Sequence, residues 1–237
     1  MIRVASESDW TDISRISAAS GYMDYIGNMG PRYLGFGETY VFQDVQIQGF
    51  CKLEVLPDHS VHLSGLRVLP EARRRGVAME LTRYLLDSGA RRGCRVARIL
   101  VESGNNASLY LSRKIGFTEV EHFHFFQGTI DTRSFSRSVN EPSYHDIGWK
   151  FILPGESESD VISFKRGGVK FSTFSEDRGD EIMDTVHYTI FSGGHLEIQD
   201  GKGVISVPER CLGSTTGLYR PMEGFSEAFL LEKDLTQ

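Results

Sequence analysis

The fold of this chain is decided by residues 66–79, which read LRVLPEARRRGVAM. A strand pattern runs into a turn at Pro70, and three consecutive arginines then precede Gly76. Apolar residues after Gly76 recur at the spacing of one helical face, which predicts an amphipathic helix. The first turn of a helix offers backbone N–H groups without intrahelical partners, and the helix dipole attracts anions there. The stretch therefore predicts a site for a diphosphate group at the start of this helix.

A second informative block covers residues 101–117, which read VESGNNASLYLSRKIGF. It begins at the end of a short apolar strand, continues as a predicted helix over residues 105–115, and closes with Gly116 and Phe117. Neither block contains the G-K-S/T of a nucleoside-triphosphate loop or the G-x-G-x-x-G of a dinucleotide fingerprint. Those two classes of nucleotide site are therefore disfavoured.

The two blocks together resemble the GNAT superfamily of N-acetyltransferases. Residues 73–78 fit its R/Q-x-x-G-x-G/A acetyl-CoA signature, and the second block resembles its N-x-x-A/S and terminal G-F. The resemblance covers residues 1 to about 127 and implies that acetyl-CoA is the cofactor. It also implies that the pantetheine arm pairs with the backbone of residues 66–68 and that backbone amides up to Met79 hold the pyrophosphate. The cofactor-binding residues expected in this way are Leu66, Arg67, Val68, Arg73, Arg74, Arg75, Gly76, Val77, Ala78, Met79, Asn105 and Ser108.

A general base is expected because amine acetylation needs the neutral form of the amine. Many family members carry a Glu four residues before the position that Leu66 takes, and His62 stands there in this sequence. An imidazole, with an ordinary pKa near 6.5, is able to deprotonate an ammonium group directly or through water. Glu54, His59 and Glu102 remain alternative candidates for this role.

The acid that protonates the leaving thiolate is often a Tyr four residues before the glycine of G-F. Ser112 takes that position here, so the family's usual acid is in doubt. Ser112 is expected to hydrogen-bond the sulfur, although a serine hydroxyl is a poor acid. Tyr110 lies two positions away, which turns its side chain by about 200° to the opposite helix face. Tyr110 is therefore interpreted as a packing or substrate-side residue.

The order of predicted elements in residues 1–127 is β–α–β–β–β–α–β–α–β. This order predicts an α/β (α+β) fold of GNAT type, with a mixed, mostly antiparallel sheet flanked by helices. Residues 128–144 are polar and are interpreted as a linker. Residues 145–237 predict a smaller C-terminal α+β domain, with a helix over residues 180–191 and a hairpin turn at residues 200–201. This domain is expected to cover the acceptor side, to build a dimer, or to be a degenerate second GNAT half.

Length and composition fit one large domain or a domain with an addition, since the chain has 237 residues, 40% of them hydrophobic. No apolar run approaches the roughly 18 residues of a membrane helix, and the N-terminus has no signal-peptide core. The three cysteines are far apart and odd in number, which favours a reducing, cytoplasmic location over a disulfide framework.

The net charge of −6 is unevenly spread along the chain. Residues 1–129 hold 15 Lys and Arg and 14 Asp and Glu, whereas residues 130–237 hold 11 and 18. An acidic chain disfavours nucleic acid as a partner, because phosphate binding needs a basic face. The acidic C-terminal part suits a cationic acceptor with a primary amine, although simple solubility explains it equally well.

Two features leave alternatives open. His122 and His124 share one strand face, but no third ligand stands at a useful spacing, so a structural role is favoured and no metal is expected. The absence of the family's Tyr at Ser112 keeps a second function in view. In that alternative the fold binds an acyl-CoA and acts as a sensor or regulator rather than as an enzyme.

Overall fold

The structure is a computed structural model of the chain, and it describes residues 1–21, 25–139, 143–153, 161–174, 185–218 and 220–236. The chain forms two compact units. The first contains residues 1–99, 111–117 and 232–237, and the second contains residues 100–110 and 118–231. Among the described residues, no helix is long and apolar enough to cross a membrane.

The first unit is built on a mixed sheet. Its strands are β1 (Ile2–Val4), β2 (Glu38–Gln43), β3 (Ile47–Val55), β4 (Val61–Val68) and the first part of β5 (Val96–Glu102), in that order across the sheet. Neighbouring strands are antiparallel from β1 to β4, whereas β4 and β5 are parallel. This arrangement is the mixed, mostly antiparallel sheet that the element order predicts.

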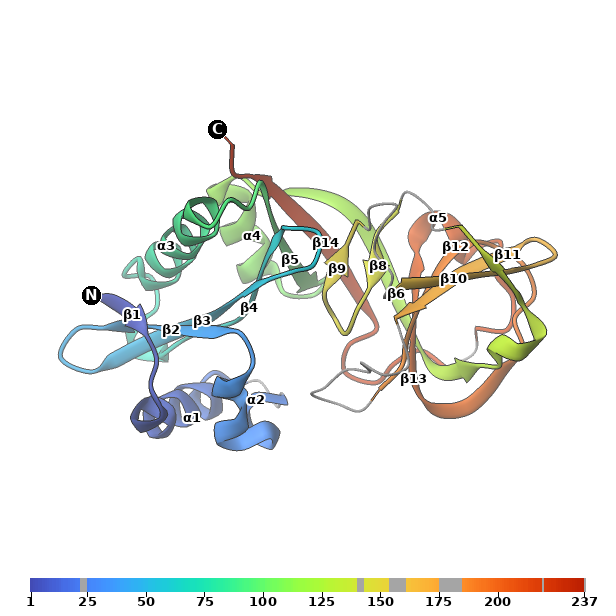
Figure 1. Ribbon diagram of the computed structural model, residues 1–237. Coiled ribbons are helices and arrows are strands. Elements are labelled where there is room, and N and C mark those ends of the chain that lie inside the picture. The colour runs from blue at the N-terminus through green and yellow to red at the C-terminus, as the bar shows by residue number, and fades with distance from the viewer. Residues whose placement is uncertain (22–24, 140–142, 154–160, 175–184, 219, 237) are drawn as a thin grey trace. The chain divides into compact units, whose positions relative to one another are not determined.

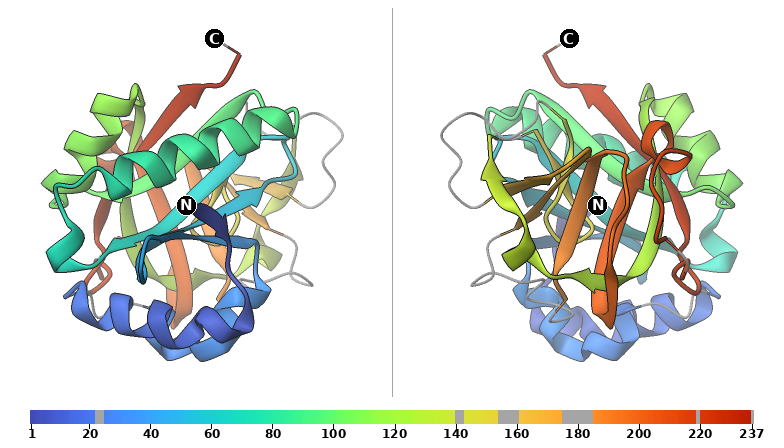
Figure 2. Two further views of the ribbon diagram at one scale, coloured as in Figure 1. Left: turned by 90° about the vertical axis from the view of Figure 1, so that its left-hand side faces the viewer. Right: turned by 90° about the vertical axis from the view of Figure 1, so that its right-hand side faces the viewer.

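Helices cover both faces of this sheet. They are α1 (Trp10–Ala19), α2 (Tyr25–Met29), α3 (Val77–Arg91) and the end of α4 (Asn106–Ile115), with short 3₁₀ turns η1 (Glu7–Asp9), η2 (Gly30–Gly35) and η3 (Pro70–Ala72). Figures 1 and 2 show α3 on one side of the strands and α1 and α2 on the other. The helix α3 forms because Val77, Leu81 and Leu85 recur on one face, and all three side chains are buried.

The second unit contains the remaining strands of the twelve-stranded sheet. Its strand order is β14 (Glu227–Asp234), β6 (Thr118–Ile130), β13 (Ile198–Pro208), β12 (His187–Ser192), β11 (Val169–Phe174), β10 (Val161–Arg166) and β7 (Ser136–Ser138). The unit also contains the pair β8 (His145–Asp146) and β9 (Phe151–Ile152), the turn η4 (Thr132–Ser134) and the short helix α5 (Glu209–Leu212). The longest pairing joins β6 and β13, which run antiparallel and side by side in Figure 1.

Two apolar clusters form the core of the second unit. One contains Phe171, Ile190 and Ile205 from neighbouring strands of the sheet. The other contains Phe123 and Phe125 on β6, together with Phe151, Ala228 and Leu230. The phenylalanines of β6 are thus core residues.

Two expectations for the secondary structure of the C-terminal half are wrong. The helix expected over residues 180–191 is replaced by β12 from His187 onward, while residues 180–184 lie outside the described residues. His187–Ile190 are all buried within a central strand, so these residues do not alternate between buried and exposed positions, which is the pattern that identifies a strand in a sequence. The linker expected over residues 128–144 contains the end of β6, η4 and β7.

The hairpin expected at residues 200–201 is also absent, because both residues lie within β13. The register with β6 shifts between Gln199 and Val204, so the Asp-Gly pair forms part of a bulge rather than a chain reversal. A Cβ atom at Gly203 would lie 2.3 Å from the carbonyl oxygen of Gly128, which explains the glycine. The compact units also differ from the predicted boundaries 1–127, 128–144 and 145–237, and the functional division into those segments stays a prediction.

Candidate active site

The end of β4 offers an open strand edge in the first unit. On one side, Val68 pairs with Gly49 and Arg67 pairs with Phe50 of β3. On the other side, the described ladder between β4 and β5 joins residues 61–62 to residues 97–98. Residues 66–68 therefore lie beyond the end of that ladder, where backbone groups are available to an extended ligand. This is the strand on which the pantetheine arm was expected.

A bulge lies just before this open edge. Residues 65–66 of β4 stand opposite Cys51 alone, because the register shifts between Phe50 and Lys52. Gly65 adopts a φ of +63°, and a Cβ atom there would lie 2.4 Å from the hydroxyl of the buried Tyr33. Only glycine fits this position, and the bulge turns the backbone of the following residues relative to β3.

The loop between β4 and α3 wraps back on itself at two left-handed residues. Arg74 has a φ of +62° and Gly76 has a φ of +90°. Left-handed backbone is ordinary for glycine but uncommon for arginine, so this loop holds Arg74 in a conformation that costs free energy. Residues 73–76 are exposed, and Gly76 is the N-cap of α3 without a side chain to cap it. The amides at the start of α3 are thus presented toward an external anion.

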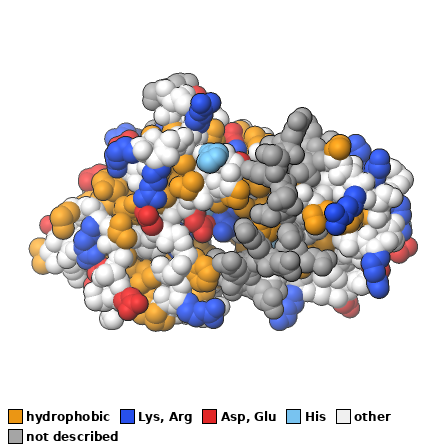
Figure 3. Space-filling view, in the orientation of Figure 1, with side chains coloured by type: hydrophobic (Ala, Val, Ile, Leu, Met, Phe, Trp, Pro, Cys, Tyr) orange, Lys and Arg blue, Asp and Glu red, His pale blue; other side chains and the backbone are white. Residues whose placement is uncertain are grey.

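The three arginines of this loop differ in their contacts. Arg73 donates from Nε to the carbonyl oxygen of Val68 at 3.3 Å, and its guanidinium also donates to the carbonyl oxygen of Ser20 at 3.3 Å. Arg73 therefore holds the loop in place, while Arg74 and Arg75 are exposed. In the view of Figure 3, several Lys and Arg side chains gather over α3, which adds positive charge around this helix.

His62 occupies the same strand, four residues before Leu66. It is buried, with 4% of its surface exposed. In the strand register it stands opposite Glu54 of β3 and Arg98 of β5. Arg98 is equally buried and forms ion pairs with Asp58 and Glu232. Burial lowers the pKa of Arg98, but the two carboxylates outweigh this and raise its pKa overall. In the strand register, His62 thus stands opposite Glu54 on one neighbouring strand and opposite Arg98 on the other.

Comparison with known proteins agrees with this geometry. Residues 7–117 match the family model described as Acetyltransferase (GNAT) family. Those residues form a GNAT acetyltransferase domain. The fold of this domain is therefore the GNAT fold that the sequence resemblance implied, and the family to which the domain belongs uses acetyl-CoA as its cofactor.

Relatives with curated names match about half of the chain. A ribosomal protein bS18-alanine N-acetyltransferase of Escherichia coli K12 is 28% identical over 109 residues, which are 46% of this chain and 71% of that protein. The chloroplastic GCN5-related N-acetyltransferase 6 of Arabidopsis thaliana is 27% identical over 133 residues, which are 56% of this chain and 45% of that protein.

A solved structure extends the likeness to the whole chain. A candidate acetyltransferase from Thermoplasma acidophilum matches with a TM-score of 0.64 at 19% sequence identity, and the match covers 99% of both chains. The overall architecture, including the part after the GNAT domain, thus occurs in another protein. The match to the family model ends at residue 117, whereas the resemblance in fold continues beyond it.

The other residues expected at the GNAT site have clear positions. In the first unit, Ser112 is buried in α4, and its carbonyl oxygen accepts hydrogen bonds from the amides of Gly116 and Phe117. In the second unit, Asn105 accepts from the amide of Ser108 at 3.1 Å and so caps the start of α4. The structure therefore brings the loop, β4 and His62 together in one unit, while Asn105 and Ser108 belong to the other.

The alternative candidates for the general base differ in burial and in position. His59 is exposed in the turn before β4, at the end of that strand remote from the cofactor loop. Glu54 stands opposite His62 in the strand register, so it is better placed than His59 to act near His62. Glu102 is half-buried at the end of β5 in the second unit. The packing role expected for Tyr110 is wrong, because 68% of that side chain is exposed on α4.

The sequence missed the partners of Arg98. Glu232 is 134 residues away, and no local pattern signals that its strand returns to the first unit. A buried arginine needs a carboxylate partner, so an arginine inside the apolar strand of residues 96–102 was the one available signal.

Proposed function

We propose that this chain is an acetyl-CoA-dependent N-acetyltransferase that moves an acetyl group to a primary amine by direct transfer. The observation that carries the proposal is the continuous path from the open edge of β4 to the exposed amides at the start of α3. The open edge suits the extended, amide-bearing pantetheine arm, and the left-handed loop suits the pyrophosphate. When bound, acetyl-CoA supplies the activated thioester.

His62 is the general base in this proposal. It lies on the strand that would hold the pantetheine arm, and its burial excludes most water from the imidazole. Neighbouring Glu54 carries a carboxylate that is able to orient the ring, in the way that carboxylates orient catalytic histidines elsewhere. Proton transfer from the ammonium of the acceptor to His62, directly or through water, would give the nucleophilic amine.

Ser112 is the proposed partner of the leaving thiolate. Its position four residues before Gly116 and its burial both support a hydroxyl that donates to sulfur. A serine hydroxyl does not release its proton readily, so the thiolate would take its final proton from water. Asn105 and Ser108, at the start of α4, are proposed to contact the cofactor, as the family resemblance implies.

The acceptor is proposed to be a primary amine with a positive charge: a small amine, a lysine side chain or a peptide N-terminus. The E. coli relative is named for acetylating the alanine of a ribosomal protein, which favours an acceptor carried by a protein. The net charge of residues 130–237 also favours a cation. A cytoplasmic location is proposed because all three cysteines are free and buried.

The decisive experiment measures CoA release from acetyl-CoA with a panel of amines. The panel contains an alanine-initiated peptide, an acetyl-capped lysine peptide and a polyamine, and mass spectrometry identifies the acetylated product. Turnover with any of them, lost in Gly76→Val, supports the enzyme. Tight binding of acetyl-CoA without turnover of any amine would instead support the acyl-CoA sensor, which the serine at position 112 keeps in view.

A further inference from the structure

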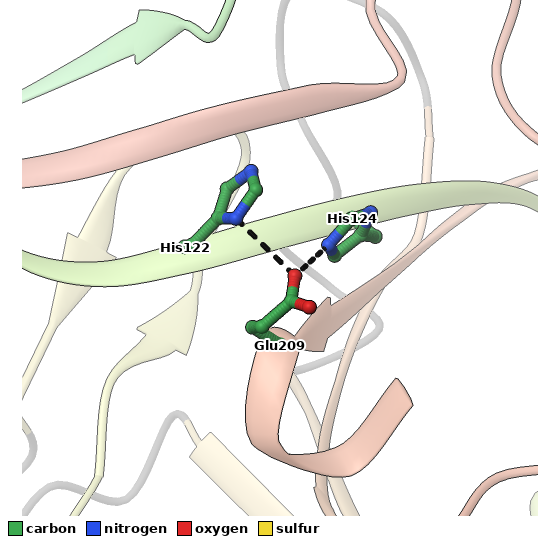
Figure 4. Close-up of side chains that lie close together, drawn as sticks. All are labelled: His122, His124 and Glu209. Carbon is green, nitrogen blue, oxygen red and sulfur yellow. Dashed lines mark hydrogen bonds and ion pairs between the residues drawn. The ribbon is translucent and has the colours of Figure 1, made fainter. Parts of the chain in front are cut away.

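Two histidines and a glutamate converge on one face of the second unit. His122 and His124 are two residues apart on β6, so both side chains point to the same side of the sheet, with ring centroids 4.7 Å apart. The register pairs Val207 of β13 with His124 and Pro208 with Phe123. The next residue, Glu209, begins α5 and turns toward both rings (Figure 4).

The donor atoms have the spacing of a metal site. One carboxylate oxygen of Glu209 lies 3.2 Å from Nδ1 of His122 and also contacts Nε2 of His124. The three donor atoms all lie within 4.8 Å of one another. Ligands about 2.0–2.2 Å from one zinc ion are separated by roughly 3–4 Å, so small ring rotations bring all three to one ion.

A second carboxylate faces the outer side of both rings. Glu227 of β14 lies 3.8 Å from Nε2 of His122 and 3.8 Å from Nδ1 of His124. The Nε2 atom of His122 is buried and has no hydrogen-bond partner among the described residues. Metal-binding histidines commonly donate their second ring nitrogen to such a carboxylate, which fixes the tautomer and the ring orientation. An ion between the rings and Glu209 would direct both outer nitrogens toward Glu227.

The charges around the cluster also suit a cation. Glu209 and Glu227 place two carboxylates against the two rings. The neighbouring Arg210 pairs with Glu121, whose side chain points to the opposite face of β6. With neutral imidazoles, the cluster carries two negative charges.

We propose that His122, His124 and Glu209 form a binding site for a divalent metal ion of the zinc class, with Glu227 orienting the two imidazoles. Nitrogen and carboxylate ligands of this kind favour zinc over magnesium or calcium, which prefer sites made of oxygen atoms. Three protein ligands leave one position of a tetrahedral ion for water or an external ligand. The site joins β6, α5 and β14, so an ion there would tie three elements of the second unit together.

The test uses the full chain, stripped of metal with a chelator and titrated with Zn²⁺ by calorimetry. We expect one ion per chain and a higher melting temperature after binding, because an ion that binds the folded state stabilises it. His124→Ala and Glu209→Gln are expected to weaken binding by more than about 100-fold, and Glu227→Gln by about 10–100-fold. The matched control is His195→Ala, an exposed histidine of the same unit outside the cluster, which is expected to bind as the wild type does.

The variants distinguish a loss of metal binding from a loss of the fold. Glu209 is 58% exposed on its side chain, so Glu209→Gln keeps the fold and isolates the loss of charge. The metal-free circular dichroism spectrum checks this, and the visible spectrum of the Co²⁺-loaded wild type reports nitrogen ligation without any substitution. The proposal is overturned if Glu209→Gln binds Zn²⁺ as tightly as the wild type, or if Mg²⁺ binds as tightly as Zn²⁺. Neither result would bear on acetyl-CoA turnover.

Discussion

Gly76 is the residue on which the cofactor loop depends most directly. Its φ of +90° lies in the left-handed region, and the nearest atom to an added Cβ, a carboxylate oxygen of Glu80, is 3.6 Å away. The protein itself therefore leaves space beside Gly76. The same loop also holds Arg74 in left-handed backbone, which costs free energy at this turn.

Gly76→Val is expected to weaken CoA binding by at least about tenfold, because left-handed backbone costs a non-glycine residue roughly 1–2 kcal/mol and the new side chain enters the phosphate site. Calorimetry with CoA measures the effect. The control is Gly93→Val, which changes a glycine with a φ of +82° and open space at the other end of α3. Equal losses of CoA affinity in both variants would contradict the role of this loop in CoA binding.

His62→Ala is expected to lower kcat by about 100-fold or more, since general-base catalysis typically contributes 10²–10⁴-fold. The KM for acetyl-CoA should stay nearly unchanged, and the loss of rate at low pH that we expect for the wild type should disappear. His62→Gln keeps the buried volume and should show the same loss of rate. His59→Ala serves as the control, since this exposed histidine lies at the remote end of β4. A wild-type rate that does not change between about pH 6 and pH 9 would contradict the role of His62.

Among the elements, β1 and α1 are joined by one well-defined contact. Arg3 of β1 donates two hydrogen bonds to Asp9, at 2.7 and 2.8 Å, and the amide of Ser6 donates to the same carboxylate. Asp9 is the N-cap of α1, and its side chain is only 9% exposed. The hydrogen bond from Arg3 lowers the pKa of Asp9 well below its usual range, although partial burial opposes the shift.

The pH dependence of stability follows from the lowered pKa of Asp9. A carboxyl group whose pKa is lower in the folded state stabilises the fold above its unfolded pKa of about 3.9, and that contribution is lost as the pH falls. Asp9→Asn is expected to cost about 1–3 kcal/mol of unfolding free energy at pH 7 and progressively less below about pH 4. Urea unfolding at pH 7 and at a pH below about 4 measures this difference in unfolding free energy. Asp12→Asn is the control, because the Asp12–Arg15 pair is exposed and is expected to contribute about 0–1 kcal/mol.

For the molecule as a whole, the GNAT unit is completed by the end of the chain. Residues 232–237 belong to the first unit, where Glu232 pairs with the buried Arg98 and the amide of Leu235 donates to the carbonyl oxygen of Arg95. In the sequence, residues 118–231 of the second unit separate residues 232–237 from the other two segments of the first unit. A boundary near residue 127 therefore separates residues that fold together.

A chain that ends at Gln127 is expected to unfold at a lower denaturant concentration than the full chain. The loss of a charged partner from a buried ion pair costs about 3–5 kcal/mol, and Arg98 is only 3% exposed. Chemical unfolding followed by circular dichroism measures the difference. Glu232→Gln in the full chain is the companion variant, since it removes this charge and leaves the strand in place. Unchanged stability in the shortened chain would show that residues 1–127 fold independently.

The sequence alone determined the parts of this protein that depend on neighbouring residues. Residues 66–79 and 101–117 predicted a strand, a phosphate-binding turn and two helices, because an amphipathic period and a glycine at a helix start are local properties. They also indicated the family and its cofactor. The C-terminal strands were less well predicted, since β12 is buried on both faces and the Asp-Gly pair of β13 is accommodated in a bulge.

The tertiary structure decided which distant residues meet. Glu209 reaches His124 across 85 residues, and Glu232 reaches Arg98 across 134. Both contacts depend on the order of strands in the sheet, which is set by burial of apolar faces over the whole chain rather than by any local pattern. The metal-binding cluster and the closing strand of the GNAT unit could therefore be recognised only in three dimensions.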